Sequence, residues 1–274
     1  MPDGSPPRST VSDAADEQAR FGAWAALAGL AIGLVAVPFG LLLFVVESRW
    51  PPLLRIDDGA RDALHGVAVD DPALVSAMKV VSAVGSAWVY VPLFAVLAAW
   101  LARRGLGRLA TFVVVTMLGS WLLNSLVKLA VHRARPVLPD PVAHAGGMSF
   151  PSGHAQSATA AVSVLLLVFL PALRGRPGRR RLALAAALAW VVVVGFARVG
   201  LGVHYVSDVL AGAVLGAAWV SATTALFSLS RRQRGRPAVE PARGLEPEHA
   251  ARLGAKPAQV SPRRARRSPR GQRP

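Results

Sequence analysis

Long apolar stretches separated by short polar segments dominate the pattern of this 274-residue chain. The first, residues 21–46, runs for 26 residues without a charged side chain and contains one proline, Pro38. A helix needs about 20 apolar residues to cross a bilayer, and the helices of soluble proteins show a polar face that these stretches lack. Five further stretches lie at residues 88–101, 109–131, 155–173, 182–199 and 205–229. The pattern therefore predicts an all-α fold, an integral membrane bundle of six transmembrane helices.

The second apolar stretch is short for a membrane span, so we expect it to include residues 80–87 as well. These residues end a segment, 47–85, that is polar and mixed in charge. Within the segment, the apolar positions 74, 75, 78, 81 and 84 follow helical spacing. We therefore expect an amphipathic helix there, lying at the membrane interface or over the bundle.

The two ends of the chain differ in composition from the middle. Residues 1–20 are polar and show no apolar periodicity, which predicts a flexible N-terminus. A secretory signal would place a basic region before a shorter apolar core, so we interpret residues 21–46 as a span and not as a cleaved signal. We expect a six-helix membrane domain over residues 21–230 and a basic, disordered tail over residues 231–274.

The tail also explains much of the high net charge. The chain carries +16, and thirteen of its 31 Lys and Arg residues follow Ser230 in a tail without Phe, Tyr or Trp. Binders of nucleic acid offer aromatic platforms for bases or a folded element that enters a groove. We therefore expect no nucleic-acid partner, and a tail that lies near the anionic headgroups of membrane lipids.

Positive charge in the short loops predicts how the six spans are oriented in the cell membrane. Arginines fill two loops, at residues 103–108 and 174–181. Because Lys and Arg collect in short cytoplasmic loops, these two loops and both termini should be cytoplasmic. By parity, the segments 128–136, 151–154 and 198–208 then share the outer face of the membrane. Ionisable groups gathered at membrane depth are costly and by default mark a functional site.

Four cations lie on that outer face, against the charge bias: Lys128, Arg133, Arg135 and Arg198. A single basic residue at a helix end usually extends toward the lipid headgroups. Several of them on the side that should be poor in positive charge indicate an anion, because arginine forks and a lysine ammonium group can together surround a phosphate.

The stretch Pro151-Ser152-Gly153 directly precedes an apolar helix and adds a second anion-binding feature. At a helix start, free backbone N–H groups and the positive end of the helix dipole favour an anion. A glycine at position 153 allows the backbone to approach such an anion closely.

Two histidines, His154 and His204, share this face with the phosphate-type groups. One histidine at a helix start is usually a capping or interfacial residue, but two beside such groups favour catalysis. Asp208 follows His204 by four residues, so the two side chains share a helix face if the sixth span begins there. A carboxylate that holds one imidazole nitrogen leaves the other free to attack. We predict His204 as a nucleophile and His154 as an acid.

Three motifs therefore stand in order along the chain: Lys128, six residues and Arg135-Pro136; then Pro151-Ser152-Gly153-His154; then Arg198, five residues, His204, three residues and Asp208. In this combination the chain resembles the type 2 phosphatidic acid phosphatases, or lipid phosphate phosphatases. That superfamily shares its signature with bacterial acid phosphatases and vanadium haloperoxidases. The resemblance covers roughly residues 60–229.

The resemblance implies a reaction and a role for each matching residue. The match to His204 attacks phosphorus to give a phosphohistidine, the match to Asp208 orients it, and the match to His154 protonates the leaving alcohol. The implied phosphate ligands are Lys128, Arg135, Ser152, Gly153 and Arg198. Water then hydrolyses the intermediate, with no cofactor and no metal. The implied substrate is a lipid phosphate at the extracytoplasmic surface: polyprenyl pyrophosphate, phosphatidylglycerol phosphate or phosphatidate.

One motif position departs from the family, and two other functions stay open. The third motif usually begins with Ser-Arg, whereas Ala197 precedes Arg198 here, and we expect activity to survive this change. One alternative is a haloperoxidase, since a phosphate site also holds vanadate, but those relatives are soluble. The other is a transporter or a silent protein that only binds lipid phosphate, which would not need both histidines and Asp208.

The remaining histidines and the absence of cysteine complete the candidate chemistry. We expect His65 and His249 to be solvated, and His132 and His144 to lie at the rim of the site. A metal cluster of His132, His144 and Asp140 has no ligand spacing that supports it. The chain has no cysteine, which excludes disulfides and a thiolate nucleophile. The oligomeric state is left open.

Overall fold

The described part of the chain contains helices and connecting segments but no strands, which confirms the predicted all-α fold class. The computed structural model describes residues 33, 37–232 and 244–253. A short helix, Val37–Glu47, comes first. The elements that follow it are α2 (Pro51–Val69), α3 (Pro72–Val84), α4 (Ala87–Arg103), α5 (Gly107–Val131), α6 (Gly153–Phe169), η1 (Leu170–Leu173), α7 (Pro177–Gly200), α8 (Val206–Arg232) and η3 (Pro247–Leu253).

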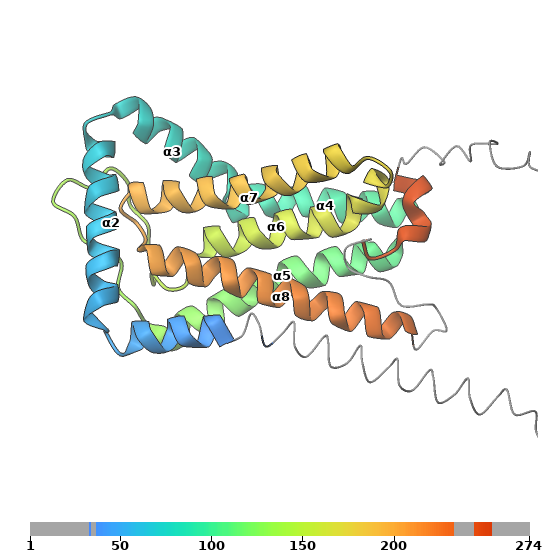
Figure 1. Cartoon of the computed structure of the whole chain (residues 1–274), viewed down its shortest axis with the longest axis horizontal. Helices are drawn as coiled ribbons and strands as arrows, with labels where there is room; N and C mark the ends of the chain where they lie inside the picture. Colours follow the sequence, from blue (N-terminus) through green and yellow to red (C-terminus); the bar gives the residue numbers. More distant parts are fainter. Residues whose placement is uncertain (1–32, 34–36, 233–243, 254–274) are drawn as a thin grey trace, which may run out of the picture.

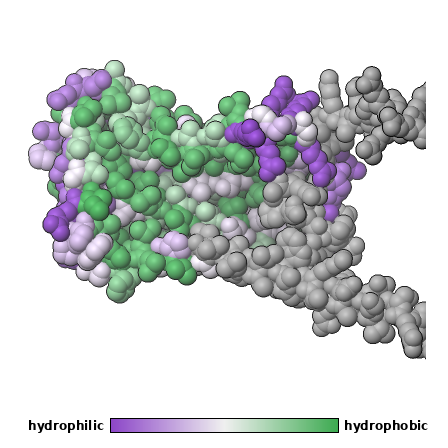
Figure 2. All heavy atoms as spheres, viewed as in Figure 1, coloured by the Kyte–Doolittle hydropathy of each residue, from purple (hydrophilic) through white to green (hydrophobic). Residues whose placement is uncertain are grey.

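Several helices are long and apolar enough to cross a membrane. Among the described residues there are five such helices, or up to six if the pair Val37–Glu47 and Pro51–Val69, bent by 91°, counts as one broken span. Figure 2 shows apolar side chains covering the visible face of the bundle between polar groups at its two ends. The prediction of a multi-pass membrane protein is thus confirmed. Most of the predicted first span, residues 21–36, lies outside the described residues.

The predicted amphipathic helix forms. Residues 72–84 form α3, and Val75 and Met78 face the interior. After a turn at Gly85 and Ser86, α3 and α4 together make a single span candidate of 32 residues. A second helix of the same polar segment, α2, crosses the end of the bundle (Figure 1). By length and composition, α3 is therefore part of a candidate span, whereas α2 covers the bundle end.

On α2, the prediction that His65 is solvated is wrong. Its side chain is buried, with Nε2 3.0 Å from the carbonyl oxygen of Asp140 and Nδ1 3.4 Å from that of Gly200. These two carbonyls belong to the segment after α5 and to the end of α7. His65 therefore joins α2 to two other parts of the bundle end.

Close packing of α6 against α8 brings the start of α6 beside the start of α8. Gly212 and Gly216 of α8 face the α6 backbone, and a Cβ on Gly216 would lie 2.7 Å from the carbonyl oxygen of Gln156. A Cβ on Gly212 would collide with the carbonyl oxygen of Ser152. Small residues allow membrane helices to approach backbone to backbone. This contact sets the distance between two of the predicted motifs.

At the opposite end of the bundle, part of the predicted disordered tail is folded. Residues 244–253 lie against the loop ends of the helices (Figure 1), and Leu245 and Glu246 are buried. Arg108 donates from Nε to Glu246 at 3.0 Å, and Arg104 donates to the carbonyl of Arg252 at 2.7 Å. The tail is basic overall, but this segment contributes a carboxylate that pairs with a loop arginine.

The α6–α8 contact predicts the effect of enlarging Gly216. In Gly216→Val the added side chain meets backbone, which cannot swing aside, so we expect the free energy of unfolding to fall by about 1–3 kcal/mol. The measurement is thermal unfolding of the protein in detergent. Gly178→Val is the matched control, because a Cβ at Gly178 meets nothing within 4 Å. Equal melting temperatures for the two variants would contradict the assigned packing.

Candidate active site

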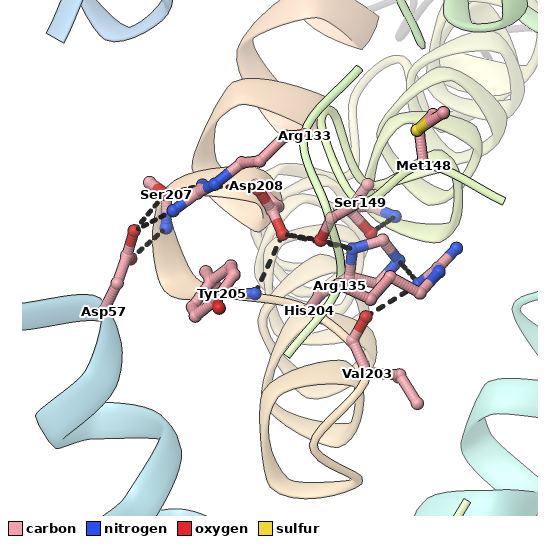
Figure 3. A network of polar contacts seen from close by, with 12 residues as sticks. Asp57, Arg133, Arg135, Met148, Ser149, Val203, His204, Tyr205, Ser207 and Asp208 are labelled. Atoms are coloured by element: carbon pink, nitrogen blue, oxygen red, sulfur yellow. Dashed lines mark hydrogen bonds and ion pairs between the residues drawn. The ribbon is translucent and has the colours of Figure 1, made fainter. Parts of the chain in front are cut away.

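The structure brings the three sequence motifs together: Arg135 and Ser152 contact the segment that carries His204 and Asp208. Figure 3 shows Arg135, His204 and Asp208 from the first and third motifs. Lys128 lies in the last turn of α5, and Arg135 follows in the segment that leads to α6. His154 lies in the first turn of α6, whereas Arg198 and His204 flank the turn between α7 and α8. The fold therefore brings these segments together at one end of the bundle.

His204 and Asp208 form the centre of the site. His204 precedes α8, which begins at Val206, so the two residues do not share a helix face as the spacing suggested. The contact forms nevertheless: His204 Nδ1 lies 3.4 Å from Asp208 Oδ2. The side chains of His204 and Asp208 are 1% and 0% exposed. A buried carboxylate beside Nδ1 favours a proton on that nitrogen and leaves Nε2 as the unprotonated one.

Arg135 faces the unprotonated nitrogen of His204. Its Nη1 lies 3.1 Å from His204 Nε2 and donates to the carbonyl oxygen of Val203 at 2.7 Å. Nε of the same guanidinium donates to the carbonyls of Gly146 and Gly147, and Nη2 donates to that of Gly146. These contacts hold the arginine beside the imidazole, with Nη1 directed at both the Val203 carbonyl and Nε2.

Arg198 is a second cation of the site and is almost completely buried, with 7% of its surface exposed. Its Nη1 donates to the hydroxyl of Ser82 on α3 at 2.5 Å. Its Nε has no hydrogen-bond partner among the described residues. A buried donor without a partner is costly, so this guanidinium is suited to an anionic ligand.

Lys128 is the third predicted cation. Its Nζ donates to the carbonyl oxygen of Met148 at 2.5 Å, which ties the end of α5 to the segment before α6. The charge of Lys128 interacts with those of Arg135, Asp208 and Arg198. The ammonium group therefore belongs to the same cluster as the two arginines.

The start of α6 places the second motif beside Asp208. Ser152 is the N-cap of α6; its hydroxyl accepts from the N–H of Ala155 at 3.4 Å, and its own N–H donates to the carbonyl of Asp208 at 2.9 Å. Gly153 follows as the first residue of the helix. His154 is partly buried and interacts electrostatically with Arg198 and His204. The backbone donors of a helix N-terminus and the second imidazole thus lie beside the cations.

Burial and nearby charges shift the pKa values of His204 and Arg135, which lie in the segments between the spans. Burial, together with the charges of Arg198 and Arg135, lowers the pKa of His204 to about 4, although the hydrogen bond and the charge of Asp208 act in the opposite direction. Burial also lowers the pKa of Arg135 below its usual value. The His204 imidazole is therefore neutral at physiological pH, as a nucleophile must be.

Several contributors to the site were not predicted. Ser149 donates to Asp208 Oδ2, and Asp57 of α2 accepts from Arg133 and Ser207. Arg133 was noted as a cation but not assigned to the site. Asp57 is one of many charged residues in a polar segment, and no local pattern distinguishes it. Its role depends on α2 crossing the end of the bundle.

Other candidates stay outside this network. His132 and His144 are exposed, consistent with the rim, and His249 is partly buried, with Nε2 3.5 Å from Glu246 Oε2 at the opposite end. In the described ranges, no group of three His, Cys, Asp or Glu side chains could hold a metal ion.

The fold and the site define a helical membrane protein in which two imidazoles, a carboxylate and several cations gather at one end of the bundle. The sequence model of the PAP2 superfamily matches residues 108–232, which contain all three motifs. This match agrees with the resemblance that the three motifs indicated.

Two relatives and one solved structure show how far the similarity extends. Phosphatidylglycerophosphatase B of Bacillus subtilis (strain 168) is 37% identical over 95 residues, which cover 35% of this chain and 46% of the relative. Lipid A 1-phosphatase of Rhizobium etli is 34% identical over 127 residues, which cover 43% of this chain and 50% of the relative. The chain thus spans about half the length of the curated relatives it matches.

The solved structure is that of a transmembrane PAP2-type phosphatidylglycerolphosphate phosphatase from Bacillus subtilis. It superimposes with a TM-score of 0.62 at 23% identity, over 72% of this chain and 95% of that one. At this identity the likeness shows the fold, and it agrees with the helical membrane bundle described above.

The unpartnered Nε of Arg198 predicts a role in anion binding. Arg198→Ala should weaken the binding of inorganic phosphate roughly 10- to 100-fold, since hydrogen bonds to charged groups contribute about 1.5–3 kcal/mol. Isothermal titration calorimetry in detergent measures this affinity. The control is Arg61→Ala, because Arg61 already pairs with Asp58 and Asp62 on α2. Unchanged affinity in Arg198→Ala would show that Arg198 does not contact the anion.

Proposed function

We propose that this protein is a membrane lipid phosphatase that removes a terminal phosphate from a lipid through a phosphohistidine on His204. The observation that carries the proposal is the arrangement around His204: Asp208 faces Nδ1, and Arg135 lies 3.1 Å from Nε2. Nε2 would face phosphorus once a phosphoryl group replaces it as the acceptor of the Arg135 Nη1 donor, which leaves an unprotonated, oriented nitrogen beside the phosphate.

In the first step, Nε2 of His204 attacks phosphorus while the bond from phosphorus to the leaving alcohol oxygen breaks. His154 gives its proton to that oxygen, so the alcohol leaves neutral. The positive charge that develops on the His204 ring is stabilised by Asp208 at Nδ1. The product of this step is a phosphohistidine, a neutral His154 and the dephosphorylated lipid.

In the second step, water attacks the phosphorus of the phosphohistidine and gives a proton to His154. The bond between Nε2 and phosphorus breaks, inorganic phosphate leaves, and both histidines return to their starting states. Covalent catalysis of this kind replaces one difficult displacement by two easier ones.

Cations and helix N–H groups stabilise the charge on the transferred phosphoryl group in both steps. Lys128, Arg135 and Arg198 supply positive charge, and Ser152 and the Gly153 backbone supply donors at the start of α6. Ala197, in place of the usual motif serine, is 1% exposed and packs in an apolar cluster with Met78 and Leu201. The missing hydroxyl therefore removes a polar group but leaves the cluster filled.

The lipid nature of the substrate is supported by the bundle and by the relatives. A site at the end of a membrane bundle meets a phosphate headgroup while the tails stay in the bilayer. The relatives named above are a phosphatidylglycerophosphatase and a lipid A phosphatase. Of the three substrates considered, phosphatidylglycerol phosphate is therefore the first to test, before polyprenyl pyrophosphate and phosphatidate.

The orientation in the membrane follows from the two arginine-rich loops. Residues 103–108 and 174–181 lie at the end of the bundle opposite to α2 (Figure 1). With those loops on the cytoplasmic side, the site opens to the extracytoplasmic side and both termini are cytoplasmic. A protein that only binds or transports lipid phosphate would not need a buried carboxylate beside Nδ1 of His204. Hydrolysis is therefore the better-supported function.

The nucleophile assignment predicts the effect of His204→Ala. Without the attacking nitrogen, phosphate release from phosphatidylglycerol phosphate in detergent should fall by at least about 10³-fold, because the covalent step is lost. The assay contains EDTA, since the proposed mechanism uses no metal. His132→Ala is the matched control, a histidine that is exposed near the site. Turnover in His204→Ala within tenfold of the wild type would rule out the nucleophile assignment.

The low pKa of His204 predicts the acid side of the pH profile. Below its pKa the imidazole is protonated and cannot attack, so activity is present above about pH 4 and is lost as the pH falls through that value. The measurement is kcat/KM against pH, corrected for titration of the substrate phosphate, whose pKa is about 6. A corrected acid limb at the ordinary histidine pKa of about 6.5 would show that His204 is not desolvated.

A further inference from the structure

A single arginine links two buried carboxylates at the edge of the site (Figure 3). Arg133 Nη1 lies 2.7 Å from Asp208 Oδ1, and its Nη2 lies 2.8 Å from Asp57 Oδ2. The side chains of Asp57 and Asp208 are 1% and 0% exposed. Burial alone lowers the pKa of Arg133, but the two carboxylates raise it above its usual value. Arg133 therefore stays charged between them.

The two oxygens of Asp208 have different partners. Oδ1 accepts from Arg133, whereas Oδ2 accepts from the N–H of Tyr205 at 2.9 Å and from the hydroxyl of Ser149, and faces His204 Nδ1. Rotation of the carboxylate would break both sets of contacts at once. The hydrogen bond from Arg133 thus fixes the orientation of the carboxylate and, with it, the position of Oδ2 beside the imidazole.

Asp57 contacts the residue that precedes Asp208 in the chain. It accepts from the N–H of Ser207 at 2.9 Å and from its hydroxyl at 2.5 Å. Ser207 immediately precedes Asp208 in the first turn of α8, and Arg133 also donates to the Ser207 hydroxyl at 2.7 Å. Asp57 therefore fixes both Arg133 and the backbone that carries Asp208.

Arg133 is not placed as a ligand of the phosphate. Both of its terminal nitrogens are occupied by Asp57, Asp208 and Ser207, and its guanidinium carbon lies 4.3 Å from the centre of the Tyr205 ring. Arg198, by contrast, keeps a buried Nε with no partner in the described part of the chain. The two arginines therefore differ in what they can offer to an anion.

The structure assigns Asp57 and Arg133 as positioning residues, which orient the His204 nucleophile through Asp208. By this assignment α2 is part of the reaction machinery and not only a cover over the bundle. The assignment rests on the proposed phosphohistidine reaction. Outer partners of metal-ligating histidines typically contribute about 10- to 100-fold to affinity or activity, and we take the lower end of that range for the nucleophile proposed here.

The test uses Asp57→Asn, which keeps the shape of the side chain and removes its charge, and Arg133→Lys, which keeps the charge and cannot bridge two carboxylates. Orthovanadate accepts a fifth ligand and so reports on the attacking nitrogen without turnover, whereas inorganic phosphate reports on the cations alone. Each variant should bind vanadate about tenfold more weakly than the wild type. Phosphate affinity should change less than twofold, and kcat should fall about tenfold with little change in KM.

A double-mutant cycle separates positioning from loss of structure. If Asp57 acts through Asp208, then Asp57→Asn should weaken vanadate binding less than twofold further when Asp208→Asn is already present. The matched control is Asp58→Asn: Asp58 is the neighbouring residue on α2, but its side chain is 52% exposed and pairs with Arg61. This control should leave both affinities unchanged.

Three results would overturn the assignment. They are unchanged vanadate affinity in both variants, an equal loss of vanadate and phosphate affinity, and an effect of Asp57→Asn that persists undiminished beside Asp208→Asn. If Asp57→Asn does not fold, Arg133→Lys in the same cycle decides between these results. The proposed function fails separately, when the wild type binds vanadate but releases no phosphate from any of the three lipids.

Discussion

The buried negative charge of Asp208 is the constraint around which the described site is organised. A carboxylate removed from water is very unfavourable unless charge and hydrogen bonds compensate it. Here a guanidinium, a hydroxyl and a backbone N–H donate to Asp208, and the His204 imidazole lies against it. These donors come from the segment before α6 and from the turn before α8. Compensating one charge therefore forces segments that are distant in sequence to meet at one point.

That meeting point depends on two structural conditions. The glycines of α8 let its backbone approach α6, so that the N–H of Ser152 donates to the carbonyl of Asp208. The α2 helix crosses the end of the bundle, where the ring nitrogens of His65 lie near two carbonyl oxygens and Asp57 accepts from Ser207. Together they bury the carboxylate, while Arg135 lies on the side of His204 Nε2. Low dielectric strengthens every charge interaction in such a site.

Much of this could be predicted from the sequence, because bilayer thickness and motif spacing are local properties of a chain. The apolar runs predicted the helical membrane bundle, and the three motifs predicted a cluster that includes His154, His204 and Arg198. The prediction was wrong for His65. This residue lies in the segment 47–85, whose mixed charge does not distinguish solvent from a buried network.

The sequence by itself determined the class of the protein, the number of apolar runs and the residue types of the candidate site. These follow from side-chain hydropathy and from spacing along one chain. Only the tertiary structure decided that Asp57 and Arg133 face Asp208, that Arg198 keeps a buried donor, and that His204 lies before α8 with its Nε2 toward Arg135. Those facts depend on how helices pack in three dimensions, because a buried charge is paired by whichever donors the packing brings to it.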